Sequence, residues 1–117
     1  MSAEPAAGAD LDLDLDLDLR ALADANRRKI LAAIRVEPRA VGFIAERVGL
    51  SQQTTSHHLG VLRAAGLAAS TREGTRHLYA VKADGLAAVR SYLDDFWPTK
   101  LSALKAAVES RELGRHG

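Results

Sequence analysis

A tight turn between two short helix-forming segments is the feature that most restricts the fold of this chain. The first segment, about Val41–Val48, ends at Gly49, a residue that readily adopts the left-handed conformation found after helices. Ser51 is a favourable N-cap for the second segment, which runs from about Gln52 to Ala65 and stops at Gly66. The spacing predicts two short helices joined by a tight turn.

The flanking segments predict the rest of a small domain. Asp24 can cap a helix from Ala25 to about Val36, which Pro38 ends. After the second short helix, the segment LAASTREGTRHLYAV reads as two short strands around a glycine-containing turn. Further helices are predicted by apolar residues at helical spacing: Leu86, Val89, Tyr92, Leu93, Leu101, Leu104 and Val108. The order of elements predicts a mainly α fold with a small β-hairpin, a winged helix-turn-helix.

The N-terminal segment contains the repeat LDLDLDLDL, from Leu11 to Leu19. Strict alternation is typical of a strand, but aspartate disfavours strands and a face of like charges repels itself. A helix would instead place four leucines on one stripe: Leu11, Leu15, Leu19 and Leu22. We expect the later half of the repeat to join a first helix that ends near Ala23, and the early half to be frayed. The expected organisation is a disordered acidic tail over residues 1–14, one domain over 15–112 and a loose C-terminus over 113–117.

Charge is unevenly distributed along the 117 residues, although the formal net charge is only +1. Residues 1–19 hold six acids and no base, whereas residues 20–82 hold eleven bases and four acids. A basic segment of this size favours a polyanionic partner.

The second short helix has an apolar and a polar side. At about 100° per residue, Leu59 and Leu62 point to the apolar side. Gln53, Ser56 and His57 point to the opposite side, and such side chains can contact base edges in a DNA major groove, where glutamine pairs with adenine. The amides at the N-terminus of a helix also attract phosphate. An ordinary surface helix with a solvated polar face is the alternative interpretation.

The turn of the expected hairpin carries Arg72, Gly74 and Arg76. Its arginines can reach a flanking minor groove or the phosphate backbone, and a solvated loop is the alternative. Further arginines that can contact phosphate and make binding depend on salt are Arg27, Arg28, Arg39 and Arg63.

Three runs of residues, RALADANRRKIL, IAERVGLSQQTTSHHLGVLRAAGL and STREGTRHLYAV, resemble the ArsR-type winged helix-turn-helix transcriptional repressors. The resemblance covers roughly Leu19 to Val81. It implies that SQQTTSHHL lies in a recognition helix and that two copies pair through their first and last helices on an inverted repeat. The residues expected to contact DNA are Gln52, Gln53, Thr54, Ser56, His57, Arg72 and Arg76. The residues expected at the dimer interface are Leu15, Leu19, Leu22, Phe96, Trp97, Leu101, Leu104 and Val108.

The sequence departs from the metal-sensing members of that family. It has no cysteine, and its last helices offer carboxylates but only His116 beside them. We therefore expect no metal and no cofactor. His58 is expected to pack against the domain, and Gly60 stands where relatives often carry lysine or arginine.

Other classes of protein are not expected either. Without cysteine the chain forms no disulfide or thiol switch, and no apolar run approaches the roughly 18 residues that span a membrane. No signal peptide is visible, so the expected location is the cytoplasm. An enzyme is not expected, because Ser56 and His57 diverge by about 100° on one helix and no glycine-rich nucleotide loop is present.

These features predict a sequence-specific regulator of transcription that binds double-stranded DNA. We expect a repressor that binds an inverted-repeat operator as a homodimer. The alternative is a winged-helix protein-interaction module, or a DNA binder that its own acidic N-terminal tail inhibits. The signal that releases DNA is expected to be an unknown small molecule or protein, and the aromatic cluster of Tyr92, Phe96 and Trp97 is interpreted as core or dimer contact.

Overall fold

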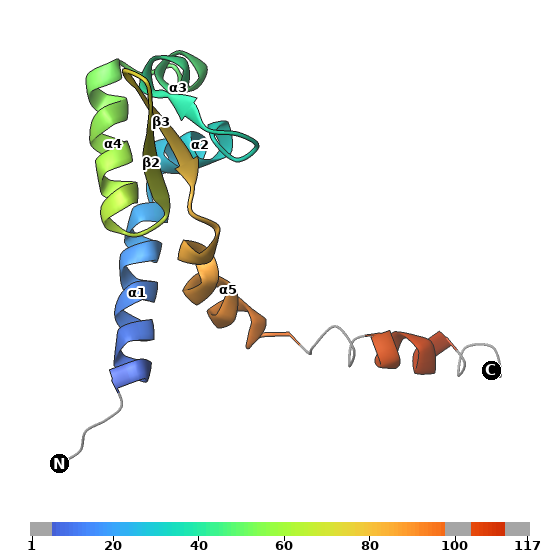
Figure 1. The fold of residues 1–117 in the computed structure, drawn as a ribbon. Coiled ribbons are helices and arrows are strands. Elements are labelled where there is room, and N and C mark those ends of the chain that lie inside the picture. Colours follow the sequence, from blue (N-terminus) through green and yellow to red (C-terminus); the bar gives the residue numbers. More distant parts are fainter. Residues whose placement is uncertain (1–5, 98–103, 112–117) are drawn as a thin grey trace.

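A computed structural model of the chain describes residues 6–97 and 104–111 (Figure 1). The helices are α1 (Ala6–Leu22), α2 (Ala25–Ala33), α3 (Val41–Val48), α4 (Gln52–Ala64) and α5 (Ala87–Asp94), with a 3-10 turn, η1 (Ala83–Leu86), before α5. The strands are β1 (Arg39–Ala40), β2 (Ala68–Glu73) and β3 (Arg76–Val81). Residues 104–111 are helical as well. The mainly α fold with a small hairpin is confirmed.

The three strands form an antiparallel sheet in the order β1-β3-β2. The expected hairpin is confirmed: Glu73 pairs with Arg76 across a two-residue turn whose first residue, Gly74, has a positive φ of 66°. Positive φ at this position is required by the tight turns that match strand twist. Strand β1 was not expected, because two residues are too few to show alternation; it pairs Arg39 with Tyr79 and so attaches the base of the hairpin to the start of α3.

The core lies where α2, α3 and α4 pack on one another and on the start of β2. Its largest fully buried residues are Ile30, Ile34, Ile44, Leu59, Leu62 and Leu67. Ile30 with Ile34 and Leu59 with Leu62 are at helical spacing, and burying these residues against Ile44 packs the three helices together. Helix α2 ends at Ala33, before the expected Val36, and Ile34 is its C-cap.

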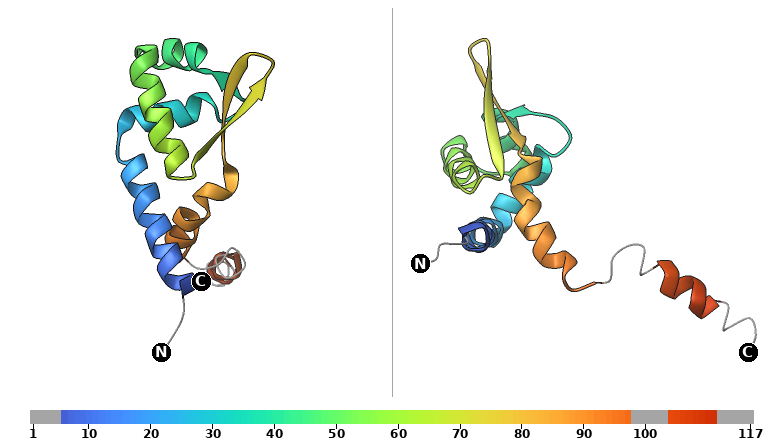
Figure 2. Two further views of the ribbon diagram at one scale, coloured as in Figure 1. Left: turned by 60° about the vertical axis from the view of Figure 1, so that its left-hand side comes forward. Right: turned by 60° about the horizontal axis from the view of Figure 1, so that its bottom comes forward.

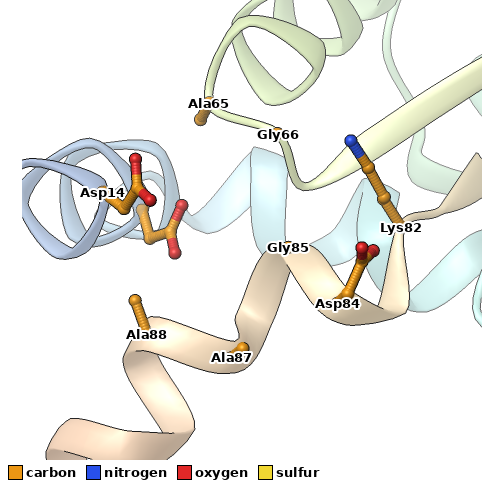
Figure 3. Close-up of a pocket in the computed structure, with 9 residues that line it drawn as sticks. Asp14, Ala65, Gly66, Lys82, Asp84, Gly85, Ala87 and Ala88 are labelled. Atoms are coloured by element: carbon orange, nitrogen blue, oxygen red, sulfur yellow. The ribbon is translucent and has the colours of Figure 1, made fainter. Parts of the chain in front are cut away.

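Helix α1 is longer than the sequence indicated. Residues 6–14, part of the tail expected to be disordered, already belong to it, whereas residues 1–5 lie outside the described part. The alternation of leucine and aspartate is compatible with a helix and distributes the leucines around its circumference. Leu13, Leu17 and Leu19 are therefore exposed. Helix α1 also packs on α5. Asp14 and Ala88 of α5 lie on opposite sides of a pocket (Figure 3).

One aspartate of the repeat faces inward. Asp18 is only 1 % exposed, and burial, together with the nearby charge of Asp14, raises the pKa of its carboxyl group. Its Oδ2 atom has no hydrogen-bond partner among the described residues. The charged form of Asp18 is therefore less favourable in the folded chain than in the unfolded chain.

No helix in residues 6–97 and 104–111 is long and apolar enough to cross a membrane.

Replacing Asp18 with asparagine should stabilise the fold at pH 7. The pKa of Asp18 is raised in the folded chain, so its carboxyl group does not destabilise the fold below the ordinary value of 3.8. Stability is lost as the pH rises through the folded-state pKa and the group ionises. Asparagine does not ionise and avoids this loss. The gain in the free energy of unfolding should shrink as the pH falls toward 3.8, as measured by urea unfolding across pH. Asp16→Asn, an exposed change on the same helix, is the control and should have little effect. A loss of stability in Asp18→Asn at pH 7 would show that the ionised carboxylate is favourable.

Candidate nucleic-acid interface

Helix α4 separates its side chains into a buried and an exposed side. Thr55, His58, Leu59 and Leu62 are buried against the core. The exposed residues include all five that the sequence placed at DNA on this helix: Gln52, Gln53, Thr54, Ser56 and His57. The structure therefore gathers these polar side chains near the N-terminus of α4, while their contact with DNA stays a prediction.

The N-terminus of α4 is fixed by Ser51. Its Oγ accepts a hydrogen bond from the Thr54 N–H at 3.0 Å and donates one to the Thr54 Oγ1, also at 3.0 Å. On the α3 side, Gly49 has a φ of 75° and donates its N–H to the Ala45 carbonyl at 2.9 Å. The Gln52 side chain extends back toward α3. Its Nε2 atom would lie 3.5 Å from a Cβ atom added to Gly42 of α3. The turn therefore sets the angle at which the exposed face of α4 is presented.

The far end of α4 closes with a hydrogen-bonded cap. Gly66 has a φ of 80° and bonds the Arg63 carbonyl at 3.0 Å, while the Leu67 N–H bonds the Leu62 carbonyl at 2.9 Å. Strand β2 then runs back alongside α4, so the tip of the hairpin and the N-terminus of α4 lie at the same end of the molecule (Figure 1). Helices α1 and α5 lie at the other end.

The hairpin projects from the helical body (Figure 2). Arg72 and Arg76 stand beside its tip and are exposed. Neither forms an ion pair within the described residues, and the same holds for the exposed Arg63 on α4. Their charges therefore face solvent near the polar side of α4.

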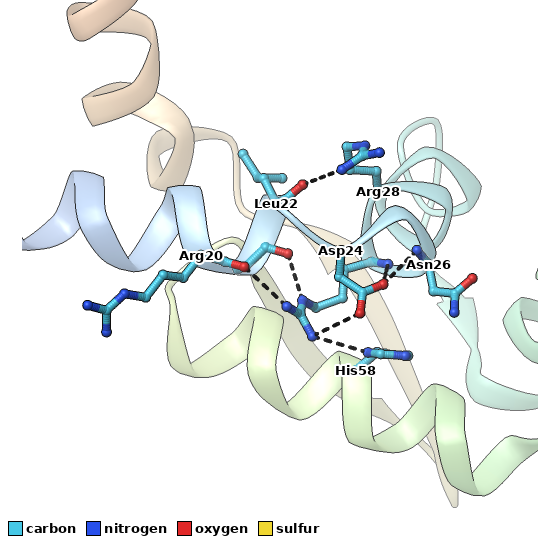
Figure 4. Close-up of polar contacts among 8 residues, drawn as sticks. Arg20, Leu22, Asp24, Asn26, Arg28 and His58 are labelled. Atoms are coloured by element: carbon cyan, nitrogen blue, oxygen red, sulfur yellow. Dashed lines mark hydrogen bonds and ion pairs between the residues drawn. The ribbon is translucent and has the colours of Figure 1, made fainter.

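Three of the arginines expected as phosphate contacts also make contacts within the chain, and their contact with phosphate stays a prediction. Arg27 donates from Nε to the Ala21 carbonyl at 2.6 Å and from Nη2 to the Arg20 carbonyl at 3.1 Å. Arg28 donates to the Leu22 carbonyl at 2.7 Å (Figure 4). Arg39 pairs with Glu37 and lies over the ring of Phe43, 4.2 Å from its centroid.

His58 packs against the domain as expected, and the structure adds its partner. Its Nδ1 lies 3.4 Å from Arg27 Nη1, which is also 3.7 Å from Asp24 Oδ2. A guanidinium can only donate, so the imidazole Nδ1 accepts. Asp24 caps α2 by accepting from the Asn26 N–H at 2.8 Å, and this bond, foremost, lowers the pKa of its carboxyl group. Sequence spacing identified the cap but not the bridge from Arg27 to α4, because that contact joins residues far apart in the chain.

The residues expected at a dimer interface fall into three groups. Leu15 and Leu22 are partly buried within the chain, and Leu101 lies outside the described residues. The remaining five are exposed, with Phe96 63 %, Trp97 65 % and Leu104 63 % accessible: Leu19, Phe96, Trp97, Leu104 and Val108. The ring of Phe96 packs edge-on against Tyr92, with centroids 5.1 Å apart. Apolar side chains thus stand uncovered on α1, after α5 and on residues 104–111.

Among the described residues, no three His, Asp or Glu side chains lie close enough together to hold a metal ion.

Comparisons with known proteins point to one kind of protein. Residues 22–71 match a helix-turn-helix domain family. The chain is 38 % identical over 91 residues to the HTH-type transcriptional regulator Rv2034 of Mycobacterium tuberculosis, covering 78 % of this chain and 85 % of the relative. It is 33 % identical to the nodulation protein NolR of Rhizobium meliloti, covering 73 % and 70 %.

Solved structures with the same fold include two with a TM-score of 0.65. The first is Mb0332 of Mycobacterium bovis, described as a homodimeric winged helix-turn-helix DNA-binding domain and a possible ArsR-family regulator. It is 29 % identical, covering 82 % of this chain and 89 % of that one. The second is an ArsR-like transcriptional regulator from Rhodococcus, 26 % identical, covering 81 % and 92 %.

Replacing Ser51 with alanine should destabilise the fold by about 1 kcal/mol, because the Thr54 N–H loses its acceptor at the start of α4. Ser51→Asp should keep most of the stability, since a carboxylate also accepts this bond and suits the helix N-terminus. Urea unfolding followed by circular dichroism measures both changes. Ser56→Ala, on the exposed side of the same helix, is the matched control. Equal stabilities for Ser51→Ala and the unchanged chain would contradict the capping role.

Proposed function

This chain belongs to the ArsR family of winged helix-turn-helix transcriptional regulators, and from that membership we propose that it binds double-stranded DNA as a homodimer and represses transcription. The observation that carries the proposal is the exposed polar side of α4 next to the arginines of the hairpin. Both lie at one end of the molecule, so a single duplex can contact them together (Figure 1). The chain then acts by binding and needs no catalytic step.

The polar side of α4 enters the major groove with its N-terminus first. Gln53 can pair with an adenine through two hydrogen bonds, and Ser56 and His57 can reach neighbouring base edges. Gln52 and Thr54 stand at the helix start, where backbone amides face a phosphate. Gln53, Ser56 and His57 thus read sequence, while the other two fix the register of the helix on the duplex.

Hairpin arginines supply affinity that does not depend on sequence. Arg72 and Arg76 are exposed and without an ion pair among the described residues, so they can neutralise phosphates or enter the minor groove. Arg63 adds a third charge on α4. Binding should therefore weaken steeply as salt rises. Gly60, two turns into α4, leaves the helix surface open and without a charge there.

Two copies pair through the apolar residues left uncovered at the opposite end. The exposed leucines of α1 and the rings that follow α5 offer a self-complementary surface, and Mb0332, which shares the fold, is described as homodimeric. Pairing at that end leaves both α4 helices free to reach successive major grooves of an inverted repeat. A dimer on such an operator blocks access of the polymerase.

The acidic repeat does not occupy the polar side of α4 in the described residues. The repeat lies within α1, which packs on α2 and α5 at the end away from the N-terminus of α4 (Figures 1 and 2). No contact in this part of the chain favours autoinhibition by the tail or a protein-interaction module.

Gln53→Ala and His57→Ala should reduce the preference for operator over random DNA, each by about 5-fold to 100-fold, because a base contact is lost. Arg72→Ala should instead weaken both DNAs together and make the salt dependence shallower by about one unit of slope. Fluorescence anisotropy over a range of salt, with an operator selected from fragments of the source genome, measures both effects. Arg90→Ala, an exposed arginine on α5, is the matched control for Arg72→Ala. An unchanged operator preference in both Gln53→Ala and His57→Ala would show that the recognition face is wrong.

Trp97→Asp should shift the chain from dimer to monomer and weaken operator binding, since an acid would replace the exposed indole at the proposed interface. Sedimentation velocity at micromolar concentration measures the change. Val36→Asp is the matched control, because Val36 is 85 % exposed but lies in the loop after α2, away from α1 and α5. Retention of the dimer by Trp97→Asp, or its loss in Val36→Asp, would contradict the proposed interface.

A further inference from the structure

A pocket of about 350 Å³ lies where α1, the end of α4, η1 and the start of α5 meet (Figure 3). We call it the α1–α5 pocket. Its volume is within the range of small-molecule sites. The side chains that line it include Asp14, Asp18, Lys82, Asp84, Ala87 and Ala88.

Asp18 gives this pocket a group that needs a partner. Its side chain is 1 % exposed, and Oδ2 is buried with no hydrogen-bond partner among the described residues. A buried carboxylate without a partner is strongly unfavourable when ionised. An ion with N–H groups would supply the hydrogen-bond donor that Asp18 Oδ2 lacks.

The surroundings of Asp18 favour a cation. Asp14 and Asp84 add two more carboxylates, and the C-terminus of α4, at Ala65 and Gly66, adds the negative end of a helix dipole. Lys82 also lines the pocket but makes no ion pair with any of these three carboxylates. The pocket therefore holds more negative than positive charge.

The geometry narrows the kind of cation. No three acidic or histidine side chains among the described residues are close enough to bind a metal ion, so the carboxylates do not form a metal centre. Alanines at 65, 87 and 88 add methyl groups to an otherwise polar lining, and these can contact a short hydrocarbon part. We propose that the α1–α5 pocket binds a small organic ammonium ion, whose N–H groups donate to Asp18 and whose apolar part packs on the alanines.

Ligand binding in the α1–α5 pocket can affect the position of α4, which carries the proposed DNA face, through a backbone contact. Gly85 lies so close to the end of α4 that an added Cβ would be 1.8 Å from the Gly66 carbonyl oxygen. The η1 turn that leads into α5 therefore lies in close backbone contact with the turn that ends α4. A ligand that changes the spacing of α1 and α5 would shift α4 in the dimer, and this regulatory step rests on the proposed function, whereas the binding step does not.

Thermal unfolding of the full chain without DNA tests the binding step. The probes are phenethylamine, putrescine and spermidine at constant ionic strength, and 2-phenylethanol is the uncharged counterpart of phenethylamine. At least one amine should raise Tm by about 5 °C at a concentration tenfold above its Kd, as calorimetric titration then determines it. Asp18→Asn should abolish the rise, and Asp16→Asn, on the exposed side of α1, should keep it.

Several results would overturn the inference. They are no rise with any of the three amines, an equal rise with 2-phenylethanol, or a rise that Asp18→Asn retains. A rise with Mg²⁺ or Zn²⁺ that Asp18→Asn removes would replace the ammonium ion with a metal.

The same amine added to the anisotropy assay tests the coupling and should change operator affinity at least 5-fold. An unchanged operator affinity with intact amine binding would refute the coupling alone. Amine binding by a chain with no affinity for any genomic fragment would refute the proposed function and leave the pocket standing.

Discussion

The guanidinium of Arg27 links three helices through polar contacts at the edge of the apolar core. It donates to the carbonyls of Arg20 and Ala21, in the last turn of α1, at 3.1 and 2.6 Å, and it lies beside His58 of α4. The Arg20 carbonyl also accepts the Ala23 N–H at 3.3 Å, and Arg27 supplies further donors where the chain turns from α1 into α2. One side chain therefore holds α1, α2 and α4 together at the point where the apolar core ends.

Much of this fold could be predicted because its core depends on local periodicity. Leu59 and Leu62 are spaced as on one side of a helix, and Gly49 and Ser51 mark the turn, so the helices and the two sides of α4 follow from neighbouring residues. The contacts of Arg27 and the pairing of β1 could not be predicted, since each joins residues distant in sequence. The candidate site was predicted on α4 and the hairpin, but composition alone could not tell which arginines form hydrogen bonds or ion pairs within the chain.

The Leu-Asp repeat shows that alternation alone determines neither the secondary structure of a segment nor which of its residues are buried. On a helix, residues two apart are about 200° from each other, so the repeat distributes leucines and aspartates around the whole circumference. Leu15 is partly buried while Leu13 and Leu17 are exposed, and Asp18 faces inward. Packing against α5 and the end of α4, rather than the pattern, selects which residue of each kind is buried.

The direction of the hairpin and its length are determined by different strand pairings, and the short strand β1 determines the direction. By pairing Arg39 with Tyr79 and Ala40 with Leu78, it sets the direction of the hairpin from its base, next to α3. The pairs from Arg72–His77 to Glu73–Arg76 set its length. Each added pair would extend the tip by about 3.3 Å and, because strands twist, would also rotate it. The pairing of β1 thus fixes where this arm leaves the helical body, and the number of β2–β3 pairs fixes how far it reaches.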